Sequence, residues 1–251
     1  MDLTPLTSWT RTLNEEDALA LLLDARPGEP LAAWAERAHD LLPQPGRDRR
    51  NETIRMVRAA LLDHEGDHIR DSAYLRLLRQ GTAAQQRDLL FGRSFFENPW
   101  ILRACEQLIH PALALAERPL PPHDARLISS DVWQGFLTSH LKPDTGAQSI
   151  PKTRAQIQRG LSRLGVLDLT TFSAQRAEPT RLAFGWLVAW ELIQTRQAEI
   201  PLAQATRRSR AALLFAPQPA WAEQCLLASV DAGLLRLTHL VGEARLHPGA
   251  L

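Results

Sequence analysis

Basic side chains gather on one segment in the middle of the chain, where they could bind a polyanion. Residues 149–164 read SIPKTRAQIQRGLSRL, and no acid lies between Ser149 and Leu167. Guanidinium and ammonium groups bind phosphate, while Thr and Gln side chains can reach phosphates or base edges. The side chains expected to contact DNA on this segment are Lys152, Thr153, Arg154, Gln156, Arg159 and Arg163.

The spacing of this segment predicts a helix that turns its cations to solvent. Its apolar residues recur mainly three and four positions apart, as one buried stripe of Ile150, Ile157, Leu161 and Leu164. Ser149 is a good N-cap, Pro151 fits the first turn and Gly165 stops the helix. A polar turn, a basic helix, a Gly stop and an apolar run are typical of the recognition half of a winged helix. The alternative is a solvated basic helix on a structural bundle.

Two further Arg-rich segments could add phosphate contacts. The first surrounds a predicted helix over residues 49–63, the last of three short helices that suggest a helix-turn-helix arrangement, and it contains Arg47, Arg49, Arg50, Arg55 and Arg58. Acids are mixed into it, so the signal is weaker. The second lies in the predicted helix 201–216 and contains Arg207, Arg208 and Arg210. A merely solvated face explains this second segment equally well.

Composition places these patches on an ordinary globular chain. The 251 residues are 45% hydrophobic and 23% charged, and the net charge is only +1, so nucleic-acid contacts must come from local patches. Cys105 and Cys225 stand far apart and form neither a metal-ligand pattern nor a disulfide framework. The most apolar stretch, 182–193, is too short to cross a bilayer and contains Glu191. We therefore expect a cytoplasmic protein without membrane association.

The periodicity along the chain predicts a mainly α fold. We expect a helical bundle with winged-helix or helix-turn-helix-like units, and β-structure confined to short hairpins near 167–172 and 235–247. Four segments are expected: an N-terminal helix-turn-helix-like unit (1–68), a central helical segment (69–118), a winged-helix-like unit (119–180), and a C-terminal helical segment with a terminal β-hairpin (181–251). The helix–Gly–apolar pattern occurs at 164–169 and again at 232–237, which suggests duplicated winged modules.

No motif of catalysis stands out. The chain has no Walker loop, dinucleotide fingerprint or GxSxG elbow. The one dense group of potential metal ligands is His64-Glu65-Gly66-Asp67-His68, in which the two His are four residues apart. Gly66 interrupts a helix there, and polar turns commonly have this composition. We predict no catalytic residue, no metal site and no cofactor, and therefore a protein that is not an enzyme.

Three stretches of the chain form a familiar combination. They are AQQRDLLF at 84–91, SFFENPWILRACEQLI at 94–109, and the spacing S-x3-T-x3-I-x3-L-x2-LGVLD at 149–168. Together with the Arg-rich entry at 47–58, they resemble the BrxA family of bacteriophage-exclusion (BREX) defence systems. The resemblance covers roughly residues 13–170.

The resemblance implies a small, mostly helical, non-enzymatic protein that binds double-stranded DNA. Its partners would be a DNA methyltransferase, an ATPase and a phosphatase-like protein of the same defence system. By position and charge, the implied DNA contacts are Lys152, Arg154, Arg159 and Arg163, with Arg47, Arg49, Arg50 and Arg55. Two alternatives stay open from the residues themselves: a protein-interaction scaffold of the same complex, and an RNA-binding helical bundle.

The basic face of the 149–164 helix yields a quantitative prediction. Arg159 and Arg163 lie four residues apart, opposite the apolar stripe, so their joint replacement by Ala should leave the fold almost intact. If each Arg neutralises one DNA phosphate, the slope of log affinity against log salt should flatten by about 1.8. A salt titration of the double variant measures this slope, and an unchanged slope in a folded variant would remove the helix from the interface.

Overall fold

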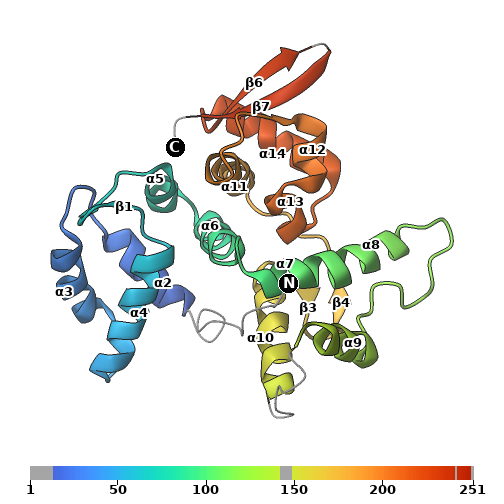
Figure 1. Ribbon diagram of the computed structural model, residues 1–251, viewed down its shortest axis with the longest axis horizontal. Coiled ribbons are helices and arrows are strands. Elements are labelled where there is room, and N and C mark those ends of the chain that lie inside the picture. The colour runs from blue at the N-terminus through green and yellow to red at the C-terminus, as the bar shows by residue number, and fades with distance from the viewer. Residues whose placement is uncertain (1–13, 142–148, 241, 250–251) are drawn as a thin grey trace.

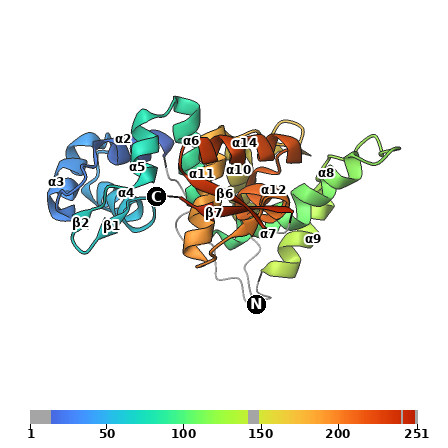
Figure 2. The ribbon, with the colours of Figure 1, turned by 90° about the horizontal axis from the view of Figure 1, so that it is seen from above.

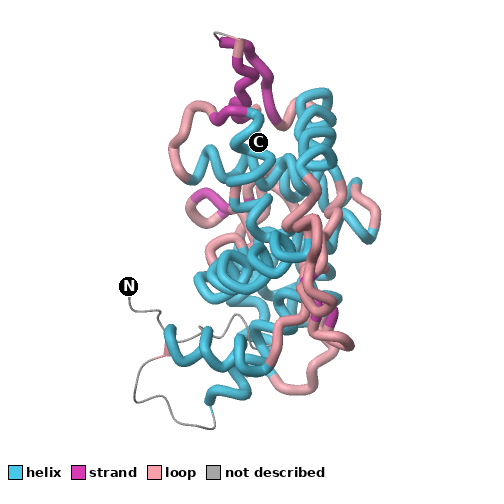
Figure 3. The backbone as a smooth tube through the Cα atoms, turned by 90° about the vertical axis from the view of Figure 1, so that its right-hand side faces the viewer, coloured by secondary structure: helices cyan, strands magenta, loops and turns pink. Residues whose placement is uncertain are grey.

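A computed structural model describes residues 14–141, 149–240 and 242–249 and confirms the expected fold class. Helices make up most of the chain, and the strands form only short antiparallel sheets (Figure 1). None of the described helices combines the length and the apolar character needed to cross a membrane. The longest strands project as a hairpin from one end of the molecule (Figure 3).

The first part of the chain forms what we call the N-terminal unit, residues 15–69. Its elements are, in order, α2 (Glu15–Asp24), α3 (Leu31–Leu41), α4 (Arg47–Ala60), β1 (His64–Glu65) and β2 (His68–Ile69). Strands β1 and β2 pair as a hairpin, and Pro30, just before α3, forms an antiparallel bridge with His68 on β2. The order is therefore helix, bridging residue, two helices and hairpin.

The same order returns in the middle unit, residues 99–174. Its elements are α7 (Pro99–Ala104), a π-helical turn (Cys105–Ile109), α8 (His110–Ala116), α9 (Ser130–His140), α10 (Ser149–Arg163), β3 (Leu167–Asp168) and β4 (Ser173–Ala174). Leu127, just before α9, bridges Ser173 on β4. Helix α10 packs on α7, and β4 packs on α8, so this unit draws residues from both sides of position 119.

The C-terminal unit, residues 181–248, has the order in its fullest form. Its elements are α11 (Arg181–Gln194), β5 (Ile200–Pro201), α12 (Leu202–Arg208), α13 (Arg210–Phe215), α14 (Pro219–Asp231), β6 (Leu235–Leu240) and β7 (Glu243–Pro248). The sheet order is β5-β7-β6, so the strand that precedes the middle helices pairs with the last strand of the hairpin. This order of elements resembles that of a winged helix. The described residues show it three times, with a three-stranded sheet in the C-terminal unit and a two-stranded hairpin plus one bridging residue in the other two.

The expectation that β-structure is confined to two hairpins is wrong. Both expected hairpins are present, but β1–β2 forms a third and β5 adds a strand to the C-terminal sheet. Each strand of β1–β2 is two residues long, and Gly66 supplies the turn at φ +55°. Strands this short show no alternation of apolar and polar residues, which is the signal that predicts a strand.

Helices α5 (Ala73–Gln80) and α6 (Ala83–Phe95) connect the first two units, and Arg93 on α6 joins the N-terminal unit to the C-terminal unit. Its guanidinium donates to both carboxylate oxygens of Asp63 at 2.7 and 3.1 Å, and to the carbonyl of Ala60 at 3.2 Å. The same group lies 4.4 Å from the ring centre of Tyr74 on α5 and 5.1 Å from that of Trp190 on α11. Arg93 therefore contacts the end of the N-terminal unit and the first helix of the C-terminal unit at once.

Burial and charge act in opposite directions on Asp63. Burial raises the pKa of its carboxyl, but the hydrogen bonds and the charge of Arg93 outweigh burial, so the net pKa lies below its ordinary value. A lowered folded-state pKa stabilises the fold above the unfolded carboxyl's pKa, about 3.9. This stabilisation is therefore present at neutral pH and disappears as the pH falls through the lower folded value.

We expect Asp63→Asn to lower the free energy of unfolding by about 3 kcal/mol at neutral pH, because it leaves the Arg93 charge buried without its partner. The difference from the parent protein should shrink as the pH falls below about 4 and approaches the lowered folded-state pKa, below which the parent carboxyl is also neutral. Urea unfolding across pH measures both effects. The matched control is Asp71→Asn, whose carboxylate pairs with Arg76 in solvent and should contribute about 0.5 kcal/mol or less. Equal losses in the two variants would contradict this role of Asp63.

Candidate nucleic-acid interface

Helix α10 lies on the middle unit as its spacing predicts. Ile157 and Leu161 are fully buried, and Leu164 is nearly so. Gly160 lets the helix approach α7 closely, because a Cβ at that position would lie only 2.5 Å from Cδ1 of Ile101. The opposite side of α10 is consequently fixed toward solvent, which is the orientation that a third helix of a winged-helix unit needs to reach DNA.

The structure separates the predicted contacts on α10 into free and engaged side chains. Lys152 and Arg159 are exposed and form no ion pair with any residue that the structure describes. Arg154 is half-buried: it donates to Oγ of Ser130 at 3.0 Å and lies 5.8 Å from the ring centre of Trp133. Arg154 therefore ties α10 to α9. The predicted polar contacts on the same helix are half-buried, namely Thr153 and Gln156.

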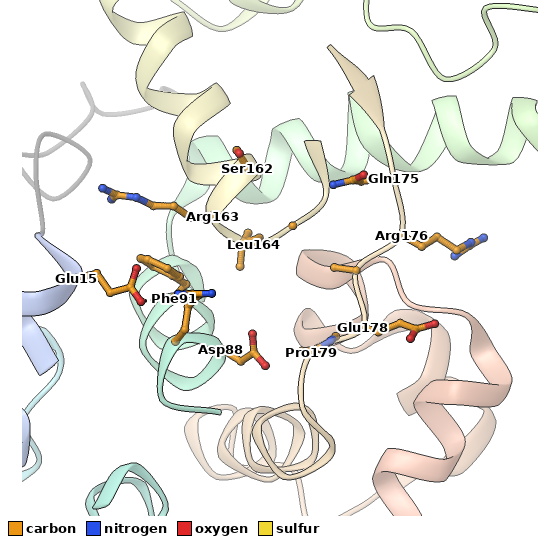
Figure 4. Close-up of a pocket in the computed structure, with 13 residues that line it drawn as sticks. Glu15, Asp88, Phe91, Ser162, Arg163, Leu164, Gln175, Arg176, Glu178 and Pro179 are labelled. Atoms are coloured by element: carbon orange, nitrogen blue, oxygen red, sulfur yellow. Dashed lines mark hydrogen bonds and ion pairs between the residues drawn. The ribbon is translucent and has the colours of Figure 1, made fainter. Parts of the chain in front are cut away.

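Arg163 stands at the rim of a cleft of about 580 Å³ between α6, the end of α10 and the segment before α11 (Figure 4). The side chain is exposed, but its guanidinium lies 5.4 Å from the ring centre of Phe91. Partial burial, and then the neighbouring charge of Arg159, lower its pKa from the ordinary arginine value. Replacing Arg163 thus removes an aromatic contact as well as a charge, whereas replacing Arg159 removes little but a charge.

Of the other charged groups that line this cleft, Glu15, Arg87, Asp88 and Arg176 bind protein atoms. Arg87 pairs with Glu15 at 3.0 Å, and Arg176 pairs with Glu117 at 2.6 Å. The carboxylate of Asp88 accepts the backbone N–H of Thr180 at 2.6 Å, and burial raises its pKa. These contacts join α6 to α2 and to the start of α11, so the cleft residues hold the units together.

Helix α4 carries the second set of predicted contacts. Arg50 is half-buried and donates to the carbonyl of His39 at 3.0 Å. Asp48 and Glu52 are exposed on the same helix. The remaining cations are exposed and have no ion pair within the described part of the chain: Arg47, Arg49, Arg55 and Arg58.

The third predicted patch is divided between two helices. Arg207 and Arg208 are exposed at the end of α12. Arg210 begins α13; its backbone N–H donates to Glu191 at 2.8 Å, and its guanidinium lies 5.0 Å from the ring centre of Phe96. Arg210 therefore packs between helices and does not extend the surface of Arg207 and Arg208. Helix α14, which occupies the position of α4 and α10 in its own unit, contains no Lys or Arg.

The relative orientation of α4 and α10 could not be predicted from the spacing of residues along either helix. In Figure 1 both helices point their N-terminal ends toward the lower edge of the molecule, α4 near the left end and α10 near the middle, and the view from above also separates them along the molecule (Figure 2). Helix α14 and the β6–β7 hairpin lie at the opposite edge. The helices that carry two of the three predicted patches thus point their basic N-terminal halves toward the same edge of the molecule.

The β3–β4 hairpin contributes residues that the sequence analysis did not single out. The β3–β4 turn is closed by Asp168, which accepts the N–H of Thr170 at 2.7 Å and the hydroxyl of Thr171 at 3.0 Å. Leu169 and Phe172 are partly exposed on this turn, and Phe172 adopts φ +54°.

The potential metal ligands His64, Glu65 and His68 lie on the exposed β1–β2 hairpin. In the described residues, no group of three or more His, Cys, Asp or Glu is placed to hold a metal ion.

The fold and this surface define a class: a mainly α-helical protein whose described residues form three units of winged-helix-like order, two of which carry a basic helix before the hairpin. Comparisons with protein-family models, with curated proteins and with solved structures find no match for the chain.

Two glycines test how α10 is held. Gly160→Ala should lower the free energy of unfolding by about 1–3 kcal/mol, because the added Cβ meets buried Ile101, even though Ala favours the helix. Gly135→Ala on α9 is the matched control, since no atom lies within 4 Å of its Cβ position, and it should raise stability by up to about 1 kcal/mol. Thermal or urea unfolding measures both. Changes of the same sign would mean that α10 does not approach α7 this closely.

Proposed function

We propose that this protein binds double-stranded DNA, without catalysing a reaction, through the exposed cations of α4 and α10. The observation that carries the proposal is that two winged-helix units present basic third helices at one edge of the molecule. A third helix is the element that enters the major groove in helix-turn-helix proteins, with its N-terminal residues nearest the bases. Lys152 on α10, and Arg47 and Arg49 on α4, occupy those N-terminal positions.

The mechanism rests mainly on the phosphate backbone. Arg and Lys neutralise phosphates and release condensed counterions, which gives affinity without sequence preference. Base readout is limited, because Thr153, Arg154 and Gln156 are half-buried against the middle unit. The biological setting that we propose is an accessory role in a bacterial phage-defence system of the BREX type, beside a methyltransferase, an ATPase and a phosphatase-like protein. This setting rests on the sequence resemblance at 84–109 and 149–168.

Binding to a fluorescent duplex of about 30 base pairs, titrated with salt, tests the proposal. With four to six phosphate contacts, log affinity should fall against log salt with a slope of roughly −4 to −5. A single strand of the same sequence should bind more weakly and with a shallower slope. Tighter binding to an RNA duplex would favour the RNA-binding alternative. A failure to bind nucleic acid, together with a protein partner captured after nuclease treatment, would favour the scaffold.

A further inference from the structure

The N-terminal and middle units are attached to α6 and α7, respectively. Helix α6 ends at Phe95 and α7 begins at Pro99, so one short corner joins the connecting helix to the middle unit. Asn98 caps α7 by accepting the N–H groups of Trp100 and Ile101, each at 3.1 Å, and the ring of Phe96 is buried 4.6 Å from that of Trp190. The corner therefore has little freedom to bend.

Further contacts fix the N-terminal unit on α6. Arg93 binds Asp63 and Ala60 at the end of α4, and Arg87 pairs with Glu15 on α2. Helix α10 is fixed on α7 by the close approach at Gly160. Helices α4 and α10 are thus attached to the two arms of one stiff corner, and their spacing and direction are set before any ligand binds.

Charge distinguishes these two helices from α14. The exposed side of α10 carries Lys152 and Arg159 with no acid on the helix, and that of α4 carries Arg49 and Arg55. Helix α14 has Glu223 and Asp231 and no cation, and it lies at the other edge. A polyanion that follows the lower edge of Figure 1 meets both basic helices and does not meet α14.

We infer that α4 and α10 bind one continuous DNA duplex at the same time and that the C-terminal unit stays off the DNA. This inference rests on the proposed function and adds the ligand's minimum length. Paired recognition helices in helix-turn-helix dimers contact sites about one helical turn apart. Here both helices belong to one chain, so a single copy requires a duplex longer than about 10 base pairs, whereas a shorter duplex occupies only one helix at a time.

The test compares a duplex of about 10 base pairs with one of about 30 base pairs. The longer duplex is short enough to hold only one copy of the protein when both helices bind it. Because the second contact becomes intramolecular, the longer duplex should bind at least about tenfold more tightly, after correction for the number of overlapping sites. Two variants remove two exposed cations each: Arg49→Ala with Arg55→Ala on α4, and Lys152→Ala with Arg159→Ala on α10. Each variant should lose the advantage of the long duplex but keep binding to the short one within about twofold, since the other helix is intact.

The control variant, Arg181→Ala with Arg236→Ala, removes the same charge from exposed positions of the C-terminal unit and should bind both duplexes as the parent does. Unchanged thermal midpoints show that all three variants fold. If only one of the two helices matters at both lengths, or if one copy captures two long duplexes together, the inference is wrong while the proposed function stands. If neither length binds, the proposed function itself fails.

Discussion

The arrangement of the molecule depends on one desolvated cation. The Arg93 side chain is only 7% exposed, and a buried guanidinium is stable only when carboxylate, carbonyl and ring faces together replace its water. Asp63, Tyr74 and Trp190 come from three different parts of the chain, so they surround the cation fully in one relative placement of the units. A general apolar contact would tolerate sliding, but this set of directional contacts does not.

Local periodicity was sufficient to predict α10 and its exposed side. Ile157 and Leu161 define a buried stripe whatever the helix packs against, so the cations opposite them had to face outward. Local periodicity could not predict that the side chains of Arg154 and Arg210 bind other groups of the protein. Arg154 binds Ser130, 24 residues earlier, and Arg210 reaches the carbonyl of Phe96, 114 residues earlier. Whether a guanidinium is free or engaged depends on such distant neighbours, which the spacing of nearby residues does not report.

The three units show how one topology supports different surfaces. Helices α4, α10 and α14 hold equivalent positions before their hairpins, and each packs apolar residues against neighbouring helices, but only the first two expose cations. The fold therefore supplies a presented helix, and the side chains on its outer face determine what it can bind. The sequence hint of duplication, the helix–Gly–apolar pattern at 164–169 and 232–237, marks the place where the third helix enters its hairpin in two of the units. The N-terminal unit lacks that pattern, and its repeat became visible only in three dimensions.

The stiff corner at residues 96–98 has a mechanical consequence. Phe96 and Asn98 fix the angle between α6 and α7, so the two basic helices address a duplex at a fixed rotational phase. In a complex of the inferred kind, over- or underwinding the DNA between the two contacts would rotate one groove away from its helix. Occupancy of both contacts would then depend on the twist of the DNA between them.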